Sequence, residues 1–193
     1  MCDRYLLNPG DDFFQRFRVC NRLPSFPKNI DVIPGQIEPV INRQEGLPLV
    51  WVMKWGLIPF WAKERGVGSK MFNVKAESVT AKLGFKKAFR SQRCLIPANG
   101  FYISSNFLNI DNRPLFSFAG IYDIWQEPVS GHEVYTYAII TTTSNSTVKP
   151  ISDRMPVILR RQDEQDWLDE KTPISKLESL LRSSSEVLAI SQQ

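Results

Sequence analysis

Three apolar runs rich in β-branched and aromatic residues constrain the fold most strongly. They are RCLIPANGFY (93–102), PLFSFAGIYDIW (114–125) and VYTYAIITTT (134–143). Residues of these types favour strands, and runs of this length that are apolar throughout are typical of strands buried in a core. We therefore expect the three runs to form the centre of one sheet.

The flanking segments predict short strands, loops and helices. Aromatic residues at helical spacing follow Asp11 and Asp12 and predict a short amphipathic helix. Between residues 30 and 53, apolar runs are separated by proline and glycine, which indicates antiparallel strands. KWGLIPFWAKERGVG (54–68) reads as a loop, and QDEQDWLDE (162–170) as a helix.

A last helix is predicted near the end of the chain. Thr172 is the expected cap and Pro173 the expected first helical residue, while Ile174, Leu177 and Leu181 would share one buried face. Strands and helices do not alternate regularly, so the sequence predicts an α+β fold with a curved, mostly antiparallel sheet. We expect residues 1–193 to form a single domain.

Composition excludes several classes of protein. No apolar run approaches the ~18 residues that a membrane helix needs, and the chain starts MCDRYLLNPG without a basic leader. We therefore expect a cytoplasmic, nucleoid-associated protein without a membrane partner. The three widely spaced cysteines and one histidine predict neither a disulfide scaffold nor a metal site. No cofactor is expected.

Positive charge is concentrated in one part of the chain. The segment from Lys54 to Arg93 carries ten basic and two acidic residues, a charge of +8, whereas the whole chain carries +4. Such a segment suits a polyanion, because lysine and arginine release counterions from phosphates. A solvated basic surface without a ligand is the alternative.

Seven short blocks resemble the signature blocks of a known family. In chain order they are MCDRY, DVIPGQIEPVI, WGLIPFWAK, FNVKAESV, FRSQRCLIPANGFY, FAGIYDIW and ISDRMPVIL. They are similar to those of the SOS response-associated peptidase (SRAP) family and extend from Cys2 to Leu159. The resemblance implies a single-domain, barrel-like fold, a positively charged groove for single-stranded DNA, and an N-terminal cysteine that crosslinks to abasic sites.

Cys2 can act as such a reactive group once Met1 has been removed. An N-terminal cysteine has an α-amine with a pKa of about 7.7–8.0 and a thiol near 8.5. The amine can condense with the aldehyde of an opened abasic sugar, and the thiol can then close a five-membered thiazolidine ring. Ring closure is intramolecular, with an effective molarity on the order of 10⁵ M or more.

Other residues are assigned to the site or to DNA binding. Asn73 matches the family's active-site asparagine and is expected to orient the opened sugar, while Arg4 would bind a flanking phosphate and favour the thiolate. Lys75 stands where the family usually has arginine. Glu77 is expected to pair with a neighbouring base, and Phe60 to lie in the core. The remaining expected DNA contacts are Lys82, Trp61 and Arg154.

Two catalytic groups of the family are replaced. The family motif GFYEW reads GFYISS here, so that Ile103 stands where a glutamate is usual, and IHDRMP reads ISDRMP, so that Ser152 replaces a histidine. Neither residue can transfer protons near neutral pH. We expect crosslinking to persist at a lower rate, with Asp111 or Glu77 as possible substitutes for the missing acid.

Two other functions remain open. A degenerate family member would bind single-stranded DNA without chemistry, as a monomer, through the basic segment. A cysteine peptidase would use Cys2 as its nucleophile, although the usual activating histidine and glutamate are replaced. A crosslinking assay separates the first alternative from the covalent function, and peptide release that depends on Cys2 would support the second.

Overall fold

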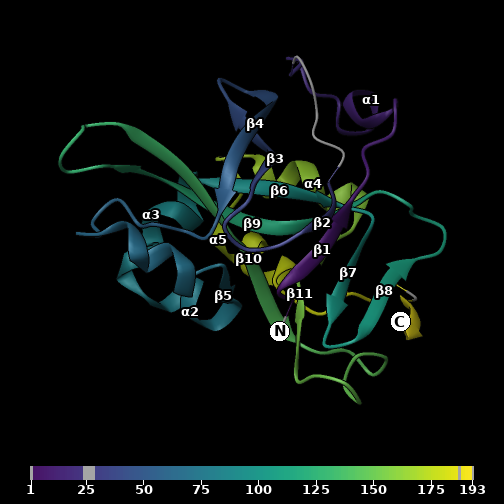
Figure 1. The fold of residues 1–193 in the computed structure, drawn as a ribbon. Helices are drawn as coiled ribbons and strands as arrows, with labels where there is room; N and C mark the ends of the chain where they lie inside the picture. The colour runs from purple at the N-terminus through teal and green to yellow at the C-terminus, as the bar shows by residue number, and fades with distance from the viewer. Residues whose placement is uncertain (1, 24–28, 187, 193) are drawn as a thin grey trace.

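Five strands close into a barrel at the centre of the protein (Figure 1). The computed structural model describes residues 2–23, 29–186 and 188–192. Around the barrel, the strand order is β4-β3-β6-β9-β10, and β10 pairs with β4 to complete the circle. This closing pair is parallel, with Thr136 opposite Lys54, and the other four pairs are antiparallel. The barrel strands are β3 (Ile37–Gln44), β4 (Leu47–Trp55), β6 (Arg93–Ala98), β9 (Phe116–Gln126) and β10 (Glu133–Thr143).

Shorter strands extend the barrel and form a second sheet. Beside β10 lie β5 (Asn73–Lys75), which is parallel to it, and β11 (Arg154–Pro156), and beside β9 lies β12 (Ile158–Leu159). The second sheet has the order β13-β8-β7-β1-β2. Its members are β1 (Arg4–Leu7), β2 (Asn29–Val32), β7 (Gly100–Ile103), β8 (Asn106–Ile110) and β13 (Leu188–Gln192).

Short helices surround the barrel. In Figure 1, α2 and α3 lie together at one side, and α4 and α5 lie behind the barrel strands. The helical elements are α1 (Phe13–Phe17), η1 (Arg65–Lys70), α2 (Ala76–Ala81), α3 (Leu83–Ser91), η2 (Arg161–Asp163), α4 (Glu164–Leu168) and α5 (Ile174–Leu180). Within the described ranges, no helix is long and apolar enough to cross a bilayer.

Four of the barrel strands, β3, β6, β9 and β10, are buried on both faces over most of their length, whereas β4 carries exposed residues. Ile41 and Leu95 pack with the helices, while their neighbours Val40 and Ile96 pack with the second sheet. A strand covered on both faces carries apolar residues at successive positions and does not alternate. This explains why the three central runs carry apolar residues at many successive positions.

The predicted α+β fold with a curved, barrel-like, mostly antiparallel sheet is confirmed. The run 93–102 forms two strands, β6 and β7, because the chain turns at Asn99. The Asn99 side chain holds this turn: Oδ1 accepts from the Asn8 amide at 2.7 Å, and Nδ2 donates to the Pro114 carbonyl at 2.5 Å.

The last helix differs from its prediction. Pro173 is the N-cap and the helix begins at Ile174, while the Thr172 hydroxyl donates to the Asp166 carbonyl at 2.7 Å and does not cap. Ile174 remains 38% exposed, so it does not share the buried face of Leu177. The expected cap and the expected face were therefore wrong at these positions.

Candidate active site

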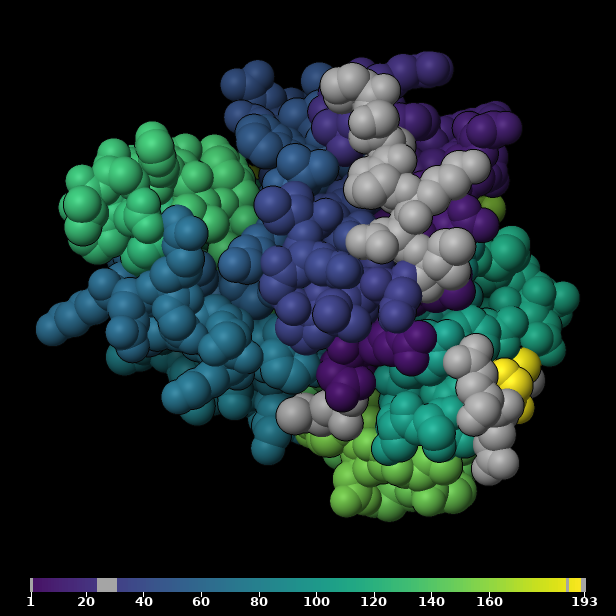
Figure 2. All heavy atoms as spheres, viewed as in Figure 1, coloured from purple at the N-terminus to yellow at the C-terminus, as the bar shows by residue number. Residues whose placement is uncertain are grey.

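Cys2 lies in the core directly before β1. Its side chain is fully buried and packs in the same apolar cluster as Tyr5, Trp55 and Ile103. Strand β1 pairs with β2 on one side and with β7 on the other, and this pairing fixes the position of Cys2 relative to the barrel. In Figure 2, the purple N-terminal segment meets the surface beside the light-green loop that joins β10 to β11.

The Cys2 thiol is protonated at neutral pH. Burial raises its pKa from the ordinary value to about 12. The hydrogen bond that the sulfur donates to the Arg4 carbonyl at 3.6 Å is a smaller effect and lowers the pKa. A thiol attacks as its thiolate. The Cys2 nucleophile must therefore lose a proton, or part of its apolar cover, before it reacts.

Asn73 holds the Cys2 backbone. Strand β5 places it beside Ile139 of β10, and its Nδ2 donates to the Cys2 carbonyl oxygen at 2.5 Å. Its Oδ1 is buried and accepts no hydrogen bond from any described residue. A buried acceptor without a donor costs free energy unless a ligand or water supplies one. The Asn73 amide thus combines a fixed contact to Cys2 with an acceptor available to a ligand.

The two replaced positions have structural roles. Ile103 is 1% exposed at the end of β7 and fills space in the cluster around Cys2. The Ser152 hydroxyl donates to the Arg154 carbonyl at 2.8 Å and accepts from the Arg154 amide at 3.1 Å, which fixes the turn into β11. Neither side chain supplies an acid or base.

The carboxylates considered as substitutes lie in other contacts. Glu77 accepts from Arg154 Nη1 at 2.8 Å and from Nη2 at 3.0 Å, and this guanidinium lowers the pKa of the Glu77 carboxyl. Asp111 is exposed in the turn after β8. The pairing of Glu77 with a neighbouring base is confirmed, and Arg154 also donates to the Thr141 carbonyl at 2.6 Å.

Two tyrosines near Cys2 were not singled out from the sequence. The Tyr5 and Tyr137 hydroxyls are 2.8 Å apart, and burial raises the pKa of both. The fully buried Glu38 adds to both shifts. Tyr5 and Tyr137 lie on strands far apart in the sequence, so spacing alone could not have paired them. The sequence signal for a buried polar group here was Glu38, which stands within the apolar segment IEPVI.

The residues expected to contact DNA differ in how free their side chains are to bind a ligand. Lys75 and Lys82 are exposed, and Trp61 is 53% exposed and packs against Gly84. Arg4 donates to Asp31, and its guanidinium lies 4.2 Å from the centre of the Tyr102 ring. Its charge is therefore directed to groups other than the Cys2 thiol.

Phe60 was expected to lie in the core, and this expectation was wrong. The side chain is 53% exposed, and the Lys87 ammonium lies 4.9 Å from its ring centre. The basic segment also contributes less surface charge than its sequence implies. Arg93 is 4% exposed and donates to the carbonyls of Trp167 and Phe89 at 2.6 and 2.7 Å. Arg93 is thus a structural residue, and the exposed charge lies mainly on α3, on Lys75 and Lys82 at the two ends of α2, and on the loop before β5.

Comparison with known proteins identifies the family. Residues 1–192 match the family described as SOS response associated peptidase (SRAP). The chain belongs to the SRAP family.

Among the described residues, no three histidine, cysteine, aspartate or glutamate side chains come together in a group that could hold a metal ion.

SRAP relatives are found in bacteria and in vertebrates. The chain is 38% identical over 196 residues to the abasic site processing protein YoqW of Bacillus subtilis, which covers 94% of this chain and 87% of YoqW. It is 29% identical over 147 residues to the abasic site processing protein HMCES of Xenopus tropicalis, covering 61% of this chain and 44% of HMCES.

Solved structures show the same SRAP-like fold. A protein from Bacteroides thetaiotaomicron superposes with a TM-score of 0.87 at 25% identity, over 98% of this chain and 90% of that one. A protein from Bordetella bronchiseptica gives a TM-score of 0.83 at 20% identity, over 100% and 99% of the two chains.

Proposed function

We propose that this protein processes abasic sites in single-stranded DNA by forming a covalent thiazolidine adduct through Cys2 after Met1 is removed. The hydrogen bond from Asn73 to the Cys2 carbonyl is the observation that carries the proposal, because it fixes the backbone that bears both nucleophiles. The names of the bacterial and vertebrate relatives support the substrate.

The chemistry proceeds in two balanced steps. The α-amine of Cys2 attacks the aldehyde carbon of the opened sugar, and water leaves to give an imine. The sulfur then adds to the imine carbon, and the thiol proton ends on the nitrogen. The unpaired Asn73 Oδ1 would accept a hydrogen bond from a sugar hydroxyl and so orient the aldehyde.

Exposed basic and aromatic groups of the segment 54–93 would bind the strand. Lys75 and Lys82 can neutralise phosphates, and Trp61 can stack on an unpaired base for about 1–3 kcal/mol. Arg154 is paired with Glu77, so phosphate binding there would compete with a carboxylate. Binding as a monomer is the simplest arrangement.

A crosslinking assay tests the proposal. Protein whose N-terminus is shown by mass spectrometry to be Cys2 is incubated with a single-stranded oligonucleotide that carries one abasic site. We expect a slow-migrating band that survives denaturant, and no band with the intact oligonucleotide or with an N-terminal extension. Absence of the band from the processed protein would exclude the covalent function.

The rate of crosslinking should depend steeply on pH. Because burial raises the pKa of the Cys2 thiol well above its ordinary value, the thiolate fraction is very small at pH 7 and rises about tenfold per pH unit below that pKa. If ring closure limits the rate, the rate should continue to rise between pH 8 and 10, beyond the titration of the α-amine. A rate that levels off near pH 8 would show that ionisation of the α-amine, and not of the thiol, sets the rate.

DNA binding without chemistry is the second candidate function. It is favoured by the protonated thiol and by Ile103 and Ser152, which supply no proton transfer. Salt-sensitive binding to single-stranded DNA that Cys2→Ala leaves unchanged, together with absence of the crosslinked band, would establish it.

A further inference from the structure

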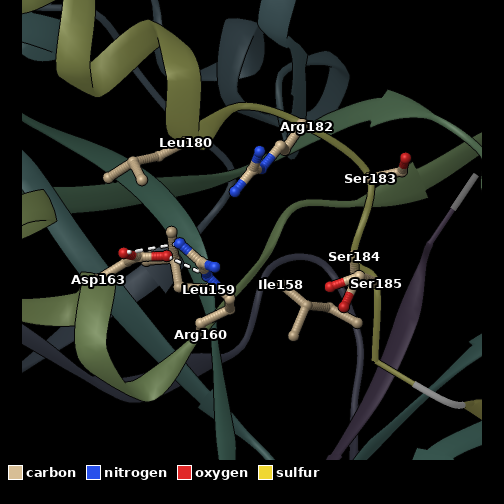
Figure 3. Close-up of a pocket in the computed structure, with 9 residues that line it drawn as sticks. All are labelled: Ile158, Leu159, Arg160, Asp163, Leu180, Arg182, Ser183, Ser184 and Ser185. Carbon is tan, nitrogen blue, oxygen red and sulfur yellow. Dashed lines mark hydrogen bonds and ion pairs between the residues drawn. The ribbon is translucent and has the colours of Figure 1, made fainter.

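A polar cavity of about 210 Å³ lies between the end of β12 and the loop that joins α5 to β13 (Figure 3). This volume is below the roughly 300 Å³ at which sites for drug-sized ligands begin, and a water molecule occupies about 30 Å³ of liquid. The cavity therefore suits a small group that carries a few hydrating waters. Its lining includes two arginines and three consecutive serines, namely Arg160, Arg182, Ser183, Ser184 and Ser185.

The cavity concentrates positive charge that its own carboxylate does not balance. Asp163 accepts from Arg160 Nε at 2.6 Å and from Nη2 at 3.2 Å, which leaves Nη1 of Arg160 free of any described partner. Arg182 forms no hydrogen bond or ion pair within the described ranges. Figure 3 shows its guanidinium extending toward the Arg160–Asp163 pair. An anion bound between the two guanidinium groups would be attracted by both.

Serine hydroxyls complete the donor set. Ser184 is 7% exposed and its hydroxyl oxygen accepts from the Glu186 amide at 3.0 Å, so its own proton is available to donate. In Figure 3, the Ser184 and Ser185 hydroxyls lie on the side of the loop that faces Arg160, whereas Ser183 points away. Guanidinium and hydroxyl donors around a small space are the groups that hold a tetrahedral oxyanion.

The loop is held in place from both sides. The Thr142 hydroxyl donates to the Leu181 carbonyl at 3.1 Å, and Asn145 Nδ2 donates to the Ser184 carbonyl at 3.0 Å. Binding would therefore require little ordering of the loop, which lowers its entropic cost. An open depression adjoins the cavity at Arg160. Its other lining residues are Arg113, Arg161, Gln162 and Glu186.

We propose that this cavity is a binding site for a phosphoryl oxyanion, held by Arg182, by the free Nη1 of Arg160, and by the Ser184 and Ser185 hydroxyls. The oxyanion is either a free phosphate or a backbone phosphate of a nucleic acid strand. The site lies outside the basic segment 54–93 and does not depend on the reaction of Cys2.

Titration with inorganic phosphate, followed by calorimetry or by NMR shifts of the Ser183–Ser185 amides, tests the site. We expect saturable binding, weakened at least tenfold by Arg182→Gln and less by Arg182→Lys, which keeps the charge but loses the planar fork. The matched control is Arg22→Gln, because Arg22 is exposed and lies over the Phe14 ring at 5.6 Å, away from the cavity. This control should bind phosphate as the wild type does.

Further measurements identify the source of the anion and keep the test independent of folding and of Cys2. Thermal melting verifies that each variant is folded, and Cys2→Ala should bind phosphate unchanged. An intact oligonucleotide that displaces phosphate assigns the site to a DNA backbone, and phosphate binding that persists at saturating oligonucleotide assigns it to a free anion. Equal phosphate affinity in the wild type and Arg182→Gln, or no saturable binding at tens of millimolar, would overturn the proposal.

Discussion

Replacing Cys2 by alanine should abolish the denaturant-stable DNA adduct and leave a reversible one. Alanine keeps the α-amine, so an imine with the abasic aldehyde can still form, but no sulfur is present to close the ring. Since ring closure draws on an effective molarity on the order of 10⁵ M or more, we expect stable adduct to fall at least a thousandfold. Adding borohydride should trap the imine and restore a band.

Cys20→Ala is the matched control for this experiment, because Cys20 is an exposed free cysteine and Cys2 a buried one. It should crosslink as the wild type does. A heat-stable band from Cys2→Ala without reductant would show that sulfur has no part in the adduct. If the wild type forms the band and Cys20→Ala does not, the reactive cysteine is Cys20 and not Cys2.

Replacing Glu164 by alanine should cause a large loss of stability. Glu164 is 4% exposed and accepts from Arg16 Nη1 and Nη2, both at 2.8 Å, and from the Ser117 hydroxyl at 2.8 Å. These contacts join α1, β9 and α4. Removing the carboxylate leaves the Arg16 charge buried and unpaired, which typically costs about 3–5 kcal/mol. For a chain of this size, that corresponds to a fall in Tm of roughly 6–20 °C.

The exposed pair of Lys149 and Asp153 provides the comparison. Its atoms are 2.6 Å apart, but the two side chains are 63% and 84% exposed. Asp153→Ala should therefore leave the midpoint of thermal or urea unfolding close to that of the wild type, because an exposed ion pair is screened by solvent. Similar losses in the two variants would mean that Glu164 is solvated. Recovery of stability in Arg16→Met/Glu164→Leu would show that the unpaired charge caused the loss.

The central strands and the fold class could be predicted because burial on both faces leaves a strong local signal. The runs 114–125 and 134–143 contain β9 and β10 almost completely. Helix α3 carried a signal too, since Phe85, Ala88 and Phe89 recur at helical spacing and are buried, but no helix was predicted there. Barrel closure by the parallel pair of β4 and β10 depends on contacts distant in sequence, which local patterns do not encode.

The site was predicted in part. The family resemblance pointed to Cys2 and Asn73, and the structure brings them into hydrogen-bond contact. The buried thiol and the Tyr5–Tyr137 pair could not be anticipated, because burial near the N-terminus depends on how β1 inserts between β2 and β7. Arg154 and Arg4 were assigned to phosphates, yet both have carboxylate partners that lie 77 and 27 positions away.

The contact between Asn73 and Cys2 also sets an order of events during synthesis. Asn73 lies on β5, which hydrogen-bonds only to β10 within the described sheet, so Cys2 cannot be held until about 140 residues have left the ribosome. If Met1 is removed as proposed, the N-terminus remains accessible to the aminopeptidase until then, and its removal would precede burial of Cys2.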